Sequence, residues 1–288
     1  GVVFNFVASV AHYAYLQQAC ADAGVEALGY IPKDESIVIP SRHLGLSIDE
    51  TFCFDAFADR VAEVIDKTVN VDRLLELCTV EFSGEQTEDV VCSGNRKIAI
   101  ARDEAFNFMY RENVEALKRA GEVVFFSPLH DKRLPDADLV YFPGGYPELY
   151  LPELAANEGM RQAVRKYCET GGRVLAECGG MMYLCDTITS DDGKVYPMAG
   201  VLKQGATMEQ MKLKLGYREV RVNGQRIRGH EFHYSRILPG HEKIPVIGTI
   251  YNAKDMVVDT PVYTYKNVLA SYIHFYWGEC GIDHFLML

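Results

Sequence analysis

The sequence lacks the features that mark several large classes of protein. Lysine and arginine together number 29 against 40 aspartates and glutamates, which gives a formal net charge of −11. Without a basic stripe to neutralise phosphates, we do not expect nucleic acid as a partner. No apolar run approaches the roughly 20 residues needed to span a membrane, and no secretory signal pattern opens the chain. We therefore expect no membrane partner either.

Paired cysteines are also missing. The eight cysteines are scattered, with no CxxC pair and no zinc-ligand spacing, and His230 and His233 have no third ligand at a suitable distance in the sequence. In a chain of 288 residues this is typical of reduced thiols in the cytoplasm. The sequence predicts no metal site and a cytoplasmic location.

Two further absences concern what lies before the first residue. The chain begins at Gly1 without an initiator methionine, and residues 2–7 already read as an interior strand. No GxxxxGK[ST] phosphate-binding loop occurs anywhere in the chain. We expect the chain to be a piece of a longer protein.

What is present is an alternation of strands and helices. In the first part the pattern predicts elements at 2–7, 10–23, 25–31 and 52–77, followed by a polar linker over 81–96. After the linker it predicts strands at 97–101, 122–126, 138–142 and 173–177, with helices at 107–120 and 159–169, and then mostly strands at 217–222, 227–234, 246–249 and 269–275. This order predicts an α/β fold with a doubly wound, mostly parallel sheet, whose chemistry lies at the carboxyl ends of the strands.

Cys178 is the strongest candidate for a reactive residue. An apolar run ends at this cysteine, and two glycines and a helix-like stretch over 181–185 follow at once. This is the layout of a nucleophile elbow, in which small neighbours such as Ala176 and Gly180 let the backbone turn sharply. A helix that starts beside the sulfur predicts a lowered pKa for the thiol, in contrast to buried thiols such as Cys168.

A second glycine-containing turn follows the strand at 138–142. Gly144 and Gly145 lie at the carboxyl end of that strand, where their backbone N–H groups can approach a ligand closely. Together with the N–H of Gly179, they are candidates for an oxyanion hole. The general base is less clear from the residues, because His274 and the pair His230 and His233 are equally good candidates.

Four motifs resemble one family across the span from Ile98 to about Phe275. The motifs are FPGGYPE at 142–148, AECGGMMYL at 176–184, GHEFHYS at 229–235 and SYIH at 271–274. In this order they resemble the class I glutamine amidotransferase domain of the cobyrinate a,c-diamide synthase family. The first 80 residues resemble the C-terminal part of the dethiobiotin-synthetase-like P-loop domain in the same family.

The resemblance implies roles for individual residues. It places the catalytic base at His274, next to the nucleophile Cys178, and gives His230 and His233 to a wall facing the substrate. Asn5 would contact adenine from the end of its strand. Many class I amidotransferases have a glutamate two residues after the base, where this chain has Tyr276, so we expect a Cys–His dyad with another orienting group.

The resemblance also implies domains, cofactors and partners. Residues 1–80 would be part of an ATP-binding domain, 81–96 a linker and 97–288 the amidotransferase domain. The complete enzyme would use glutamine, ATP and Mg²⁺ to amidate the a- and c-acetates of cobyrinate, with a homodimer as one expected assembly. Alternatives are the same chemistry on hydrogenobyrinate or nickel-sirohydrochlorin, cobyric acid synthesis, a non-catalytic tetrapyrrole-binding scaffold, or a peptidase or esterase built on the elbow.

A first prediction concerns the nucleotide. Phosphoryl activation depends on a phosphate loop and Mg²⁺, and Asn5 alone cannot hold a triphosphate. We expect this polypeptide to bind ATP weakly or not at all and to form no diamide. Isothermal titration with ATP and Mg²⁺ checks this, and micromolar affinity or any amidated tetrapyrrole would contradict it.

Overall fold

The computed structural model describes residues 1–39, 41–42, 45–46, 53–81 and 94–278. The chain divides into two compact units, Gly1–Thr87 and Glu88–Leu288. The division falls inside the predicted linker 81–96, most of which lies outside the described residues. No helix among the described residues is both long and apolar enough to cross a membrane.

The first unit contains a small parallel sheet with three helices. Strand β1 (Val2–Val7) pairs in parallel with β2 (Ala27–Pro32). The remaining elements are α1 (Val10–Asp22), η1 (Glu35–Ile37), β3 (Ser41–Arg42), β4 (Gly45–Leu46), α2 (Phe54–Thr68) and α3 (Val71–Cys78). The single helix expected over 52–77 is therefore two, because Val69 is extended and the side chain of Asn70 accepts from the N–H of Arg73 to begin a new helix.

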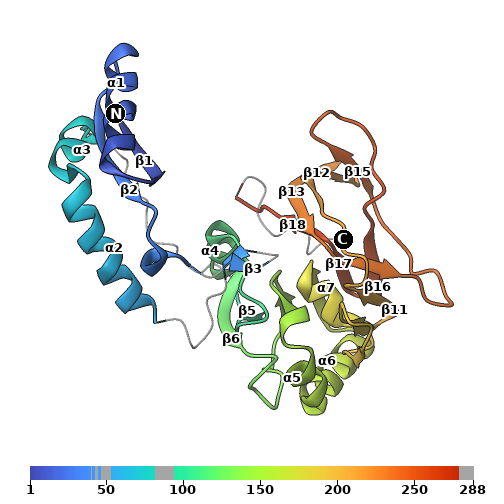
Figure 1. Cartoon of the computed structure of the whole chain (residues 1–288). Coiled ribbons are helices and arrows are strands. Elements are labelled where there is room, and N and C mark those ends of the chain that lie inside the picture. The colour runs from blue at the N-terminus through green and yellow to red at the C-terminus, as the bar shows by residue number, and fades with distance from the viewer. Residues whose placement is uncertain (40, 43–44, 47–52, 82–93, 279–288) are drawn as a thin grey trace. The chain divides into compact units, whose positions relative to one another are not determined.

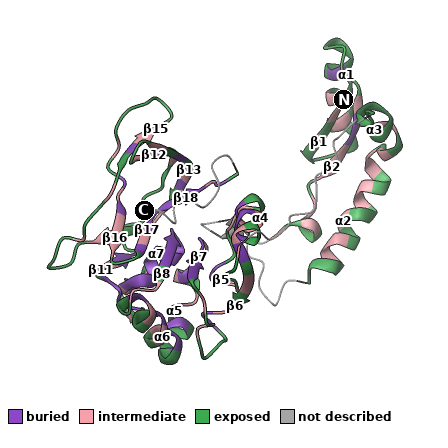
Figure 2. Cartoon of the chain, turned by 180° about the vertical axis from the view of Figure 1, so that it is seen from behind, coloured by how far each residue is buried: buried purple, intermediate pink, exposed green. Residues whose placement is uncertain are grey.

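Helix α2 buries little of its apolar face. None of its residues is fully buried, and Phe54 is 58% exposed. Figure 2 shows this helix in the colours of intermediate and exposed residues. Only Val7, Cys20 and Leu28 are buried apolar residues among the described part of this unit.

The second unit is built on a six-stranded sheet in the order β16-β17-β8-β7-β5-β6. All neighbouring strands are parallel except β16 and β17, which confirms the predicted doubly wound α/β fold. Its elements are β5 (Arg96–Ala101), α4 (Arg111–Ala120), β6 (Gly121–Phe126), β7 (Leu139–Phe142), η2 (Pro147–Leu149), α5 (Leu151–Ala156), α6 (Glu158–Glu169), β8 (Arg173–Glu177), α7 (Gly179–Leu184), β16 (Val262–Tyr265) and β17 (Val268–Ser271).

Two four-stranded sheets complete this unit (Figure 1). One has the order β10-β9-β11-β14, from β9 (Cys185–Thr189), β10 (Val195–Pro197), β11 (Leu202–Thr207) and β14 (Arg236–Leu238). The other has the order β15-β12-β13-β18, from β12 (Lys214–Val222), β13 (Gln225–His233), β15 (Thr249–Asn252) and β18 (Ile273–Phe275). A buried apolar cluster joins this last sheet to the six-stranded one, including Ile98, Tyr141 and Leu175 on one side and Val220, Ile227 and Phe275 on the other.

The strand expected over 269–275 is two strands in different sheets. Strand β17 belongs to the six-stranded sheet, whereas β18 pairs with β13. The hydroxyl of Ser271 donates to the main-chain oxygen of Pro261 at 2.8 Å and accepts from the N–H of Ile273 at 3.2 Å, which bends the chain at Tyr272. Hydrophobic alternation alone could not show this change of sheet.

Asn113 generates a prediction about stability. Its buried side chain donates to the main-chain oxygen of Phe275 at 2.7 Å and accepts from the N–H of Trp277 at 2.8 Å. Removing a hydrogen-bond partner from a buried backbone group costs about 1–3 kcal/mol, so Asn113→Ala should lower the free energy of unfolding by about 2 kcal/mol or more. Urea unfolding followed by the fluorescence of Trp277, the single tryptophan, measures this.

The matched control is Asn107→Ala, since Asn107 is exposed and its side chain makes one hydrogen bond among the described residues, to the main-chain oxygen of Glu104 at 3.2 Å. This change should leave the unfolding curve nearly unaltered. If both variants shifted the curve equally, Asn113 would not hold the segment after β18 in place.

Candidate active site

Cys178 occupies the sharp turn that the sequence predicted. It lies between β8 and α7 with φ 47° and ψ −106°, a conformation that is strained for any residue except glycine. Its N–H donates to the main-chain oxygen of Ser271 at 2.7 Å, and its own oxygen accepts from Met182 at 3.0 Å. The hydrogen bonds on both sides hold the nucleophile elbow in its strained form.

The two residues after the cysteine must be glycine for steric reasons. A Cβ atom on Gly180 would lie 2.3 Å from the main-chain oxygen of Phe142, the last residue of β7. A Cβ atom on Gly179 would lie 2.7 Å from Cδ of Pro147 and 3.0 Å from the oxygen of Gly145. The loops that leave β7 and β8 therefore meet backbone to backbone, as expected for the carboxyl ends of neighbouring parallel strands.

The predicted lowering of the pKa of Cys178 is wrong. The residue is only 7% exposed, and burial, followed by the charge of Glu148, raises the pKa of its thiol well above the usual range. A hydrogen bond from the Gly179 N–H acts in the opposite direction but is weaker. Helix α7 has only six residues, so its dipole is small against the cost of removing a thiolate from water.

The glycine loop after β7 lies beside the elbow. Tyr146 donates its N–H to the oxygen of Ala105 at 2.9 Å, and Phe108 donates to the oxygen of Gly144 at 3.0 Å. Gly145 has φ 156°, and a Cβ there would lie 2.1 Å from the oxygen of Ala105. These contacts fix the loop next to Gly179, so the three glycines proposed for the oxyanion hole come together at one edge of the sheet.

His274 reaches the same edge from the strand next to β8. Strand β17 pairs with β8 up to Ser271 opposite Glu177, and His274 follows in β18. The imidazole lies against Gly144, because a Cβ on that glycine would be 2.2 Å from Cε1 of the ring. The structure thus brings Cys178, Gly144 and His274 to the carboxyl ends of three adjacent strands.

The imidazole of His274 is held by ring contacts. Its Nδ1 atom is buried and has no hydrogen-bond partner among the described residues. The ring of His230 stacks on it with 4.8 Å between the ring centroids and 16° between the ring planes. Phe108 makes an edge-to-face contact with it, with a centroid distance of 4.6 Å and an angle of 70°. Burial, and then the charges of His230 and His233, lower the pKa of His274 to about 3.

Glu177, which precedes Cys178 in the sequence, supports β18, the strand that contains His274. Its carboxylate accepts from the hydroxyl of Tyr141 at 2.8 Å and from the N–H of Phe275 at 3.3 Å. Burial raises the pKa of this carboxyl to about 8. Since Phe275 follows His274, the glutamate ties β18 to the strand that carries the nucleophile.

The two other candidate histidines differ in their surroundings. His230 is partly buried and receives or donates a hydrogen bond at Nδ1 with the hydroxyl of Tyr110 at 2.7 Å. His233 is buried, with Nδ1 2.7 Å from the oxygen of Ser235, Nε2 2.8 Å from Glu231, and its ring stacked on Tyr272 at 3.5 Å. Both nitrogens of His233 are thus engaged inside the protein.

Glu231 forms a buried ion cluster that the sequence did not reveal. Its fully buried side chain accepts from Arg218 at 2.7 Å, from Thr260 at 2.8 Å and from His233, and Lys214 lies 3.4 Å away. Although burial acts to raise its pKa, the bonds from His233 and Thr260 and the charge of Lys214 lower it to about 2. The cluster fixes β13, whose Phe232 oxygen accepts from the thiol of Cys178 at 3.9 Å.

Three other residues of the site carried no usable signal. Glu148 lay inside a quoted motif, yet nothing showed that its charge would reach Cys178, or that burial would raise the pKa of Glu148 itself to about 7. Phe108 and Tyr110 lie in the loop before α4, far from the two histidines in the sequence. The fold brings Phe108 against His274 and Tyr110 against His230. Long-range contacts of this kind leave no local pattern.

Asn5 is exposed and lies within β1 rather than at its end. Its side-chain oxygen accepts from the N–H of Phe6 at 2.9 Å, and Phe6 has φ 58°. One acceptor position of Asn5 is thus already occupied by the chain itself. No three His, Cys, Asp or Glu side chains gather as a possible metal site in the part of the chain that the structure describes.

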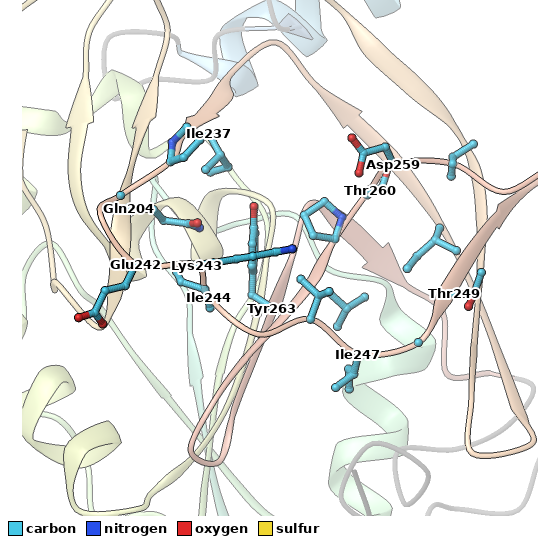
Figure 3. A pocket seen from close by; sticks show the side chains of 18 of the residues that line it. Gln204, Ile237, Glu242, Lys243, Ile244, Ile247, Thr249, Asp259, Thr260 and Tyr263 are labelled. Carbon is cyan, nitrogen blue, oxygen red and sulfur yellow. The ribbon is translucent and has the colours of Figure 1, made fainter.

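A separate pocket of about 630 Å³ lies beside β14, β15 and β16. Figure 3 shows Lys243 reaching into it, whereas Glu242 points away. Thr260 lines this pocket and also donates to Glu231. None of the predicted site residues lines it.

The comparison with protein families decides the identity of this fold. A family model described as the CobB/CobQ-like glutamine amidotransferase domain matches residues 97–280. The chain belongs to this family. The resemblance seen in the four sequence motifs is therefore confirmed, and the elbow cysteine lies inside the glutamine amidotransferase domain.

Two curated relatives resemble the chain over nearly its whole length. Cobyrinate a,c-diamide synthase of Salmonella typhimurium is 35% identical over 294 residues, which cover 97% of this chain and 64% of that protein. Hydrogenobyrinate a,c-diamide synthase of Pseudomonas aeruginosa is 36% identical over 278 residues, which cover 96% and 62%. The chain thus spans less than two thirds of the length of these two relatives.

The solved structures add little. The structure of PurLQS from Thermotoga maritima covers 62% of this chain and 86% of that one, with 19% identity and a TM-score of 0.44. A likeness at this level carries no argument about the site.

The charge of Glu148 generates a prediction about thiol reactivity. Because a neighbouring negative charge disfavours the thiolate, Glu148→Gln should lower the pKa of Cys178 and speed its alkylation by iodoacetamide near pH 7. Mass spectrometry of the peptide that contains Cys178 gives the rate. Glu153→Gln, an exposed glutamate on α5, is the matched control, and equal rates in both variants would contradict the prediction.

Proposed function

We propose that this chain hydrolyses glutamine through Cys178 and His274. The observation that carries the proposal is the strained cysteine elbow beside Gly144 and the His274 ring, at the carboxyl ends of three adjacent strands. The membership of the glutamine amidotransferase family supports the substrate.

In this mechanism the sulfur of Cys178 attacks the side-chain amide carbon of glutamine. His274 takes the thiol proton and passes it to the departing nitrogen, which leaves as ammonia. Backbone N–H groups of Gly145 and Gly179 hold the oxyanion that forms on the amide oxygen. A water molecule, deprotonated by His274, then attacks the thioester and releases glutamate.

The surroundings set the starting protonation states. With the pKa of His274 near 3 and the pKa of Cys178 raised, the free site contains a neutral imidazole and a thiol rather than an ion pair. The thiol of Cys178 is directed to the oxygen of Phe232, so the proton transfer to His274 requires a small reorientation as glutamine binds. Catalytic hydrogen bonds often form only in the substrate complex.

The complete reaction is proposed by analogy with the relatives. We infer that the ammonia serves to amidate the a- and c-acetates of cobyrinate, with hydrogenobyrinate or nickel-sirohydrochlorin as alternative tetrapyrroles. The names of the two relatives support the first two substrates. We further propose a homodimer and a cytoplasmic location, the latter because the described cysteines are free thiols.

ATP and Mg²⁺ belong to that complete reaction and do not fit the residues of this chain alone. The chain has no phosphate-binding loop, and Asn5, proposed to contact adenine, already uses its oxygen on Phe6. His230 and His233 remain candidates for the wall that faces the tetrapyrrole. Since both nitrogens of His233 are engaged, its part would be to support that wall rather than to contact the substrate.

Two other classes of function are separated by simple observations. A non-catalytic tetrapyrrole-binding scaffold would not need the strained Cys178 or a buried histidine beside it. A peptidase or esterase would cleave peptide or ester substrates and would not hydrolyse free glutamine. Glutamate release from glutamine, measured on this chain, separates the proposed function from both, and cleavage of ester substrates separates a peptidase or esterase from a scaffold.

Substitution of the dyad tests the proposal. Cys178→Ala should abolish glutamine hydrolysis, and His274→Ala should reduce it by roughly a hundredfold to ten-thousandfold, as expected for a lost general base. His233→Ala should preserve far more hydrolysis, provided that circular dichroism shows a folded chain. Turnover retained by Cys178→Ala would exclude the mechanism, and a greater loss in His233→Ala than in His274→Ala would reverse the choice of base.

A further inference from the structure

Within the residues that the structure describes, Nδ1 of His274 lacks the hydrogen bond that usually orients a catalytic histidine. A carboxylate or carbonyl that accepts from the second ring nitrogen fixes the plane and the tautomer of such a ring. Here Nδ1 of His274 is buried without a partner among the described residues, and the residue two positions later is Tyr276. Some other contact must fix the ring.

His230 stacks on the ring of the proposed base. The two histidines are direct partners in the pairing of β13 and β18, and their rings lie nearly parallel, 4.8 Å apart at 16°. Phe108 presents an edge-to-face contact to both rings, at 4.6 Å from His274 and 5.7 Å from His230. A ring stacked in this way cannot rotate about χ2 without losing the contact.

His230 is itself fixed from a different element. Its Nδ1 lies 2.7 Å from the hydroxyl of Tyr110, which precedes α4, and the two rings meet at 5.9 Å. Burial lowers the pKa of His230, so this imidazole is neutral near pH 7. A neutral ring can stack on His274 without repelling the proton that the base must accept.

We propose that His230 is a positioning residue for the general base, stacking on His274 in place of the orienting carboxylate. Tyr110 in turn holds the ring of His230, and Gly144 leaves the space that the base occupies. This inference rests on the proposed glutaminase function of Cys178 and His274. It gives His230 a role in the hydrolysis itself, which a place on the tetrapyrrole wall would not require.

The test compares three substitutions at position 230 in the full chain. His230→Ala removes the ring, His230→Gln keeps a side chain able to bond Tyr110 but cannot stack, and His230→Phe stacks but cannot bond Tyr110. We expect kcat for glutamine hydrolysis to fall about tenfold to a hundredfold in the first two, with KM changed less, because a misplaced catalytic group costs about that much. His230→Phe should recover most of the rate.

The control is His241→Ala. His241 is exposed and lines the separate pocket beside β14, β15 and β16, which none of the predicted site residues lines. It should leave kcat unchanged. Tyr110→Phe, which loses only the hydroxyl, should reduce kcat less than His230→Ala.

An independent readout does not need turnover. NMR titration of the labelled His274 ring follows a pKa that a merely structural role would not change. The titratable groups that face the two rings are Tyr110 and Tyr217, together with His233, whose charge also reaches His274. Burial is the main cause of the low pKa of His274, so His230→Ala, which uncovers one face of the ring, should raise this pKa, whereas His230→Phe should raise it less.

The outcomes separate the two claims. Wild-type rates in His230→Ala would overturn the stacking role and leave the glutaminase function intact. A rate recovered by His230→Gln but not by His230→Phe would do the same. An unchanged pKa of His274 in His230→Ala would also count against the role, even if the chain alone proved inactive. A wild-type chain that hydrolyses no glutamine would count against the proposed function only.

Discussion

The parallel pairing of β7, β8 and β17 is the constraint on which the rest of the site depends. Phe142 lies opposite Ala176 and Glu177 opposite Ser271, so the three strands end at the same level. Each of the three strands is followed by a segment that carries one part of the proposed site: a glycine loop, a strained cysteine or a histidine. A slip of one residue in any of these pairings would remove one part from the site.

The close approach of these segments buries the site away from water, and this burial sets the pKa values of its residues. Burial raises the pKa of Cys178 and lowers that of His274, so both groups are stored without charge. Of the carboxyl groups nearby, that of Glu231 belongs to a buried ion cluster, and the charge of Glu148 acts on the sulfur of Cys178. In the proposed mechanism the chemistry therefore begins from a thiol and a neutral ring, and charge develops only when glutamine is present.

The sequence predicted the features that depend on local patterns. The alternation of strands and helices, the elbow at Cys178 and the glycine loop were all visible, because each has its own residue signature. The bend at Tyr272, the second four-stranded sheet and the ring stack on His274 were not, because they arise from contacts between distant segments. The wrong expectation for the thiol pKa has the same origin, since a local helix start was visible and the surrounding burial was not.

The bend at Tyr272 places the nucleophile and the base on different sheets. Cys178 follows a strand of the six-stranded sheet, whereas His274 lies in the sheet formed with β12, β13 and β15. The separation of sulfur and imidazole is therefore set by the apolar layer between the sheets, where Tyr141 and Leu175 meet Val220 and Phe275. We expect substitutions in this apolar layer to change the alignment of Cys178 and His274, and so turnover, before they unfold the chain.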